Sequence, residues 1–146
     1  MATVNWERFE SFFALYEKLQ SVQKLIYVIG ETHHVYIGSV GCKEGEGGLA
    51  VRYQKQYVER SKAIFGSDTP LNQPAFAGTF IDLSGTTSEN VGDVEKLIQW
   101  AFLRGGDRNQ AMFKRPSRRP KVEVEHCGDV PSFLKVTRKN LGASSQ

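Results

Sequence analysis

Two short segments and the turn between them constrain the fold of this chain more than any other feature. Residues 24–29 and 35–40 are rich in β-branched and aromatic side chains, and the polar stretch between them starts with Gly30. Segments of this composition form strands, and a short connector that contains glycine lets the chain reverse between two antiparallel strands. The sequence therefore predicts a β-hairpin over these residues.

An aromatic pattern precedes the hairpin. Large apolar side chains recur there at spacings of three and four, which is the spacing of one face of an α-helix. Asn5 stands where the N-cap of such a helix is expected. We therefore predict one amphipathic helix over residues 6–19, within an N-terminal helical addition (residues 1–22) that covers one side of a sheet. Its apolar face consists of Trp6, Phe9, Phe12, Phe13, Tyr16 and Leu19.

The rest of the chain contains further helix and strand patterns. Glycine-rich sequence indicates a loop, spacings of three and four indicate helices, and alternation indicates strands. The polar tail, residues 137–146, is expected to be flexible. The order of the elements predicts a single α+β domain over residues 1–146, with a small, mainly antiparallel β-sheet flanked by helices, an extra N-terminal helix and a C-terminal strand. The patterns fall at residues 41–48 (loop), 49–65 (helix), 76–83 (strand), 91–103 (helix) and 122–125 (strand).

Positive charge is concentrated between residues 104 and 121. The net charge of the whole chain is only +3, but this stretch holds many cations and a single acid, Asp107. A surface of this kind suits a polyphosphate partner such as DNA. A solvated basic loop is the alternative interpretation. The cations are Arg104, Arg108, Lys114, Arg115, Arg118, Arg119 and Lys121.

The cysteine and hydropathy patterns bear on the compartment. Cys42 and Cys127 lie far apart in the sequence and match no metal-binding spacing. This usage favours a reducing compartment. No apolar run approaches the length of a membrane span, and the first residues carry no signal-peptide pattern. We therefore expect a cytoplasmic protein without a membrane partner.

The hairpin also carries a motif. Its first strand reads Leu-Ile-Tyr-Val-Ile and its second Val-Tyr-Ile-Gly-Ser, which puts Tyr27 and Tyr36 on adjacent strands. This pair resembles the signature of the GIY-YIG nuclease superfamily. The resemblance continues in order through the two later helices and the segment after them, and it covers most of the chain from the hairpin onward. The matching residues there are Arg52, Glu95 and Asn109.

The resemblance implies an endonuclease that hydrolyses DNA phosphodiester bonds with one Mg²⁺ or Mn²⁺ ion. Adjacent antiparallel strands can point side chains into one face, so Tyr27 and Tyr36 are expected to share a site. Tyr27 would be the general base for the attacking water, and Tyr36 would position it or share that role. Arg52 would neutralise the scissile phosphate, and Glu95 would hold the metal ion. Asn109 would hold a loop or a phosphate through its amide.

One position departs from the family pattern and keeps alternatives open. The family commonly has a histidine or tyrosine four residues after the arginine, where this chain has Gln56. Tyr57 or Tyr53 would have to serve instead, from a somewhat different face of the helix. This favours the alternative of a catalytically degenerate DNA-binding or interaction module. A plain structural domain is a third alternative, and it would place Tyr27, Arg52 and Glu95 on separate faces.

Two smaller expectations complete the sequence-based picture. Glu95 has its own alternative role, as an exposed glutamate that pairs with Lys96 or Gln99. The chain is also short for a nuclease with its own specificity domain. A homodimer, a targeting partner or the shape of the DNA would then supply the specificity.

Overall fold

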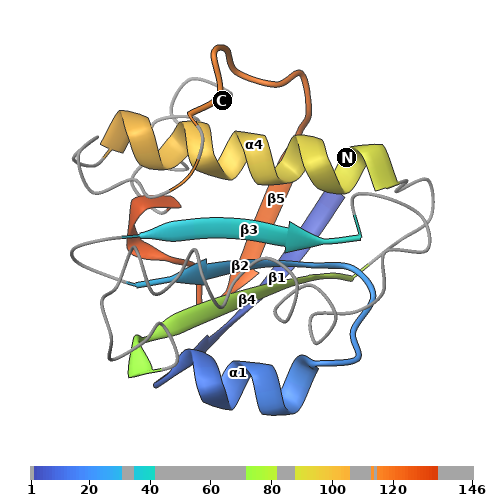
Figure 1. The fold of residues 1–146 in the computed structure, drawn as a ribbon. Coiled ribbons are helices and arrows are strands. Elements are labelled where there is room, and N and C mark those ends of the chain that lie inside the picture. Colours follow the sequence, from blue (N-terminus) through green and yellow to red (C-terminus); the bar gives the residue numbers. More distant parts are fainter. Residues whose placement is uncertain are drawn as a thin grey trace.

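The computed structural model describes residues 2–30, 35–41, 72–81, 88–105, 113 and 115–134, without the side chains of residues 88–90 and 105. These residues form the predicted α+β fold, a mainly antiparallel sheet with helices on its two faces (Figure 1). Three predicted segments lie outside the described residues: the loop at 41–48 (except for Gly41), the helix at 49–65 and the flexible tail.

The sheet has five strands in the order β3-β2-β4-β1-β5. Strands β2 and β3 pair antiparallel, which confirms the predicted hairpin. Strand β4 pairs antiparallel with both β2 and β1, and only β5 runs parallel to its neighbour, β1. The strands are β1 (Ala2–Phe9), β2 (Leu25–Ile29), β3 (Tyr36–Val40), β4 (Ala75–Phe80) and β5 (Val124–Gly128).

The N-terminal segment differs from the prediction. Residues 2–9 form strand β1, and only Phe12–Leu19 forms a helix, α1. The helix prediction from residue 6 was therefore wrong, and Asn5 lies in β1 opposite Thr79 instead of capping a helix. The N-cap is Ser11, whose side chain accepts a hydrogen bond from the backbone N of Ala14. Since β1 lies between β4 and β5, it is an interior strand of the sheet and not an addition to it.

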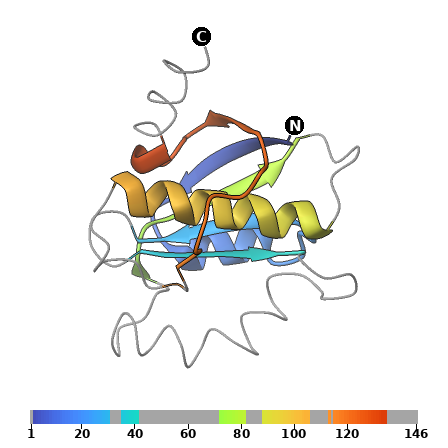
Figure 2. The same cartoon turned by 90° about the horizontal axis from the view of Figure 1, so that it is seen from above.

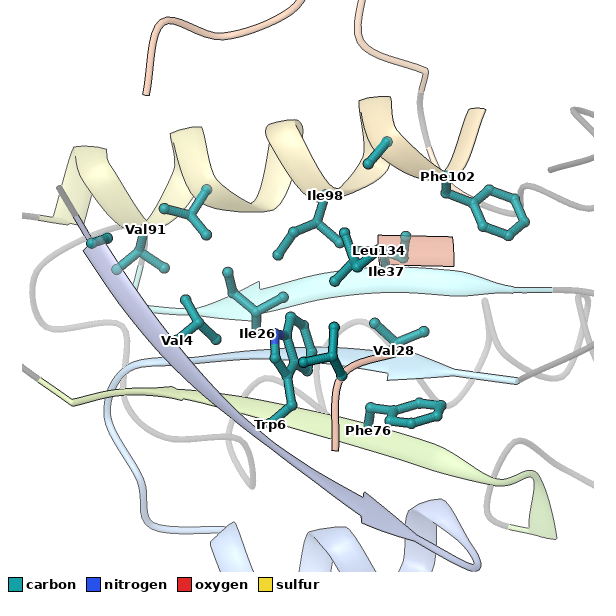
Figure 3. Close-up of a cluster of buried hydrophobic side chains, with 14 of the residues drawn as sticks. Val4, Trp6, Ile26, Val28, Ile37, Phe76, Val91, Ile98, Phe102 and Leu134 are labelled. Carbon is teal, nitrogen blue, oxygen red and sulfur yellow. The ribbon is translucent and has the colours of Figure 1, made fainter. Parts of the chain in front are cut away.

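Two hydrophobic clusters lie on opposite faces of the sheet. One lies between the sheet and helix α4 (Ser88–Gly105), and Figure 3 shows β1 and β2 side chains pointing toward Val91 and Ile98 of that helix. The other lies between the sheet and α1, where Phe12 and Leu15 are fully buried. Alternate strand residues point to alternate faces, so β1, β2, β3 and β4 each contribute to both clusters. Figures 1 and 2 show α1 and α4 on the two sides.

The C-terminal segment returns over α4 to the sheet. It crosses the side of α4 that faces away from the sheet and then enters β5 (Figure 2). Before the crossing, Phe113 packs edge-on against Phe102 of α4, with ring centroids 5.9 Å apart. Strand β5 begins two residues later than predicted and continues to Gly128, because it pairs with β1. Within that pairing, Trp6 Nε1 donates a buried 2.9 Å hydrogen bond to His126 Nδ1.

Candidate functional site

The two tyrosines of the hairpin lie on the same face, as predicted. Their rings are stacked, with centroids 6.2 Å apart and planes inclined by 22°. Tyr27 is fully buried in the cluster on the α1 side, where its ring lies 5.8 Å from that of Phe12. Tyr36 is half-buried. Of the pair, Tyr36 is therefore the tyrosine that solvent can reach.

Gly38 makes room for Tyr27. Tyr27 pairs with Gly38 across the β2–β3 ladder, and its hydroxyl end lies over that glycine. A Cβ at this position would come within 2.6 Å of Tyr27 Cζ and closer still to the hydroxyl. Residues with a side chain cannot approach so closely, so the glycine of the motif has a packing role here.

We expect Gly38→Ala to lower the free energy of unfolding by about 1–3 kcal/mol, because either the ring or the strand must shift to admit the methyl group. Chemical denaturation monitored by fluorescence measures this change. The double variant Gly38→Ala/Tyr27→Phe should recover part of the loss, since the hydroxyl oxygen is the atom nearest the new methyl group. Equal stability of Gly38→Ala and the original protein would contradict this packing.

Glu95, the predicted metal ligand, is half-buried between α4 and the edge strand β3. Ser39 Oγ donates a hydrogen bond to Glu95 Oε1, and Gln99 Nε2 donates one of 3.1 Å to Glu95 Oε2. Gln99 Nε2 also donates to the backbone oxygen of Ile37, again at 3.1 Å. Glu95 thus pairs with Gln99, as one alternative expected, but it is a carboxylate held against β3 and not an exposed surface glutamate.

Sequence reasoning missed the part that Ser39 plays. It directly follows the Tyr-Ile-Gly motif, and its side chain is fully buried. Alternation along β3 places Ser39 on the same face as Ile37, which packs toward α4. A polar residue at an inward strand position was the available signal, because such a residue needs a hydrogen-bond partner when buried.

The structure does not bring Tyr27 and Glu95 together on one face. Tyr27 and Gly38 lie on the α1 side, whereas Ser39 and Glu95 lie on the α4 side. The two faces meet at β3, the edge of the described sheet, where Gly38 and Ser39 are consecutive residues. The expectation that the tyrosines and Glu95 share one face was therefore wrong, and the plain structural domain is the alternative that predicted this separation of Tyr27 from Glu95. The candidate residues instead lie around the β3 edge. The candidate residues Arg52, Gln56, Tyr57 and Asn109 lie outside the described residues.

The described cations of the basic stretch are on the surface. Arg104 is exposed in the last turn of α4. Four further exposed cations belong to the segment that crosses α4 on the side away from the sheet (Figure 2). These four are Arg115, Arg118, Arg119 and Lys121, whereas Arg108 and Lys114 lie outside the described residues.

Glu95 and Ser39 carry the type of donor atom that a hard divalent cation prefers. A carboxylate and a neighbouring hydroxyl are oxygen ligands, and magnesium is usually held by one or two carboxylates together with water and phosphate oxygens. Within the described ranges, no group of three or more His, Cys, Asp or Glu side chains is gathered as a metal cluster would require. A single-carboxylate site is thus the arrangement that these residues offer to a metal.

Comparison with known proteins found no family model, no curated protein and no solved structure that matches the chain. No helix in the described part of the chain is long and apolar enough to cross a membrane.

Proposed function

We propose that the chain is a divalent-metal-dependent DNA endonuclease in which Glu95 holds one Mg²⁺ or Mn²⁺ ion. One observation carries the proposal: Glu95 is hydrogen-bonded to Ser39, 56 residues away in the sequence. Ser39 directly follows the Tyr-Ile-Gly motif, and Glu95 is the metal ligand that the family resemblance implies on a later helix. Two parts of the sequence pattern are thus in contact in the folded chain.

The residues around the β3 edge divide the work. Glu95 binds the metal ion, which when present would stabilise negative charge on the phosphate and the leaving oxygen. Tyr36 is the better candidate for the general base, since Tyr27 is fully buried and stacks against it. A phenol has a pKa of about 10 in water, so a nearby positive charge has to favour its deprotonation at neutral pH. A DNA strand along this edge would contact groups from both faces of the sheet.

The basic segment that crosses α4 would hold DNA. Arg118 and Arg119 are exposed there, and neutralising a phosphate releases condensed counterions. We expect Arg118→Ala and Arg119→Ala each to reduce the slope of log K against log salt by about 1. Lys18→Ala, on α1 at the opposite face, should leave the slope unchanged. Fluorescence anisotropy with duplex DNA between low and moderate salt measures it, and equal slopes for all variants would exclude this segment from the interface.

A cleavage assay tests the proposal itself. Purified protein is incubated with supercoiled, branched and single-stranded DNA in the presence of Mg²⁺, Mn²⁺ or EDTA. We expect nicking or cutting with the divalent cations and none with EDTA. Arg52→Ala is the comparison variant, because the family resemblance gives that residue the scissile phosphate. Cleavage that persists in EDTA would exclude a metal-dependent mechanism.

A second candidate is a DNA-binding module that does not cleave. The placement of Tyr27 favours it, because a fully buried tyrosine on the face opposite Glu95 serves as core packing. Salt-sensitive DNA binding without cleavage under any divalent cation is the outcome that this alternative predicts.

A further inference from the structure

Two hydrogen bonds fix the orientation of Gln99, a polar side chain beside Glu95. It is only 5% exposed, and its Nε2 donates to both Glu95 Oε2 and the Ile37 carbonyl, each at 3.1 Å. A primary amide has two N–H donors, so these bonds use both of them. The reverse orientation would turn the amide oxygen toward two acceptors, which excludes it. The amide therefore has one orientation, and it links the carboxylate to the backbone of β3.

Ser39 holds the other carboxylate oxygen. Its hydroxyl donates to Glu95 Oε1, and its side chain is fully buried. These two partners of Glu95 thus connect to the same strand: Ser39 is a residue of β3, and Gln99 is bonded to Ile37 of β3. A carboxylate fixed at both oxygens loses its rotational freedom when the protein folds and not when a ligand binds.

We propose that Gln99 and Ser39 are positioning residues that fix the Glu95 carboxylate at the edge of β3 for metal binding. This inference rests on the proposed function, because it assigns the metal ion to Glu95. Residues that orient a metal ligand through hydrogen bonds typically change metal affinity by about 10–100-fold when replaced. A purely structural role for Gln99 would instead lower thermal stability and leave the metal affinity of the folded protein unchanged.

The test is a calorimetric titration of the full chain with Mn²⁺, below the melting temperature of each variant. Glu95→Gln should abolish the binding event, and Gln99→Met should weaken it about 10–100-fold. Ser39→Ala should also weaken Mn²⁺ binding. Two surface substitutions are the controls and should bind as the original protein does: Asp93→Asn, which removes an exposed acid from the same helix, and Gln20→Met, which makes the same replacement beyond the end of α1.

The outcomes separate this inference from the function on which it rests. Loss of binding in Glu95→Gln with unchanged affinity in Gln99→Met and Ser39→Ala overturns the positioning role alone. Unchanged binding in Glu95→Gln overturns the metal assignment and the positioning role with it. If Gln99→Met does not fold, Ser39→Ala and the shorter amide in Gln99→Asn decide the question, because Asn has one methylene less with which to bridge Glu95 and Ile37.

Discussion

A chain that lacks residues 1–22 is expected not to fold. Strand β1 pairs with β4 on one side and β5 on the other, so its removal splits the sheet. The deletion also removes Trp6 from one hydrophobic cluster and Phe12 from the other. Circular dichroism and amide chemical-shift dispersion of the truncated protein measure the result. A truncated chain that keeps a cooperative unfolding transition would contradict the interior position of β1.

Single substitutions test the core role of β1 without deleting the strand. Trp6→Ala is expected to lower the free energy of unfolding by about 3–5 kcal/mol, since it empties a buried site and leaves His126 Nδ1 without the hydrogen bond from the indole. Phe13→Ala is the matched control, because that side chain is 49% exposed, and it should change stability by less than about 0.5 kcal/mol. Similar effects of the two substitutions would contradict a core role for β1.

Glu95→Gln is expected to reduce metal-dependent DNA cleavage by about 10³-fold while the protein stays folded. A bound metal ion supplies several kcal/mol of charge stabilisation in the transition state, and each ~1.4 kcal/mol corresponds to a factor of ten in rate. The glutamine keeps the size of the side chain and can still accept the hydrogen bond from Ser39. Asp93→Asn, an exposed position on the same helix, should cleave at the original rate. Equal rates for these two variants would remove Glu95 from the mechanism.

The hairpin was predictable because its signal is local. Two runs of strand-forming residues flank a polar connector with a glycine, and neighbouring strands in sequence usually pair. The helix predicted at 91–103 was found as Ser88–Gly105 for the same reason: its apolar spacing repeats over several turns. The strand predicted at 76–83 was found as Ala75–Phe80.

Strand β1 was not predictable from spacing alone. Trp6, Phe9, Phe12 and Phe13 are separated by intervals of three and four that continue into α1, so the helical pattern extends across the boundary at Ser11. The burial of alternate residues from Ala2 onward depends on β4 and β5, which come more than 60 residues later in the chain. Contacts between distant segments override local propensity in such cases.

The candidate site also combines features that depend on local sequence with features that depend on contacts between distant segments. Glu95 was found half-buried beside Val94 and Ile98, two core residues of the same helix. The burial of Tyr27 depends on Phe12 of α1, and the role of Ser39 depends on how α4 lies against β3. No short-range pattern in the sequence specifies how α1 or α4 packs on the sheet. The prediction therefore put the tyrosines and Glu95 on one face, whereas the sheet separates Tyr27 from Glu95.

The most direct test of a metal-dependent nuclease is a reversible cleavage time course on supercoiled plasmid. The cleavage reaction is started by adding Mg²⁺ to purified protein, stopped with EDTA and restarted with excess Mg²⁺. Glu95→Gln at the same concentration is treated in parallel. We expect nicked plasmid to accumulate with Mg²⁺, its accumulation to stop with EDTA and to resume with excess Mg²⁺, and Glu95→Gln to leave the plasmid supercoiled. Plasmid that stays intact with the original protein under every divalent cation, while DNA binding persists, would contradict the account.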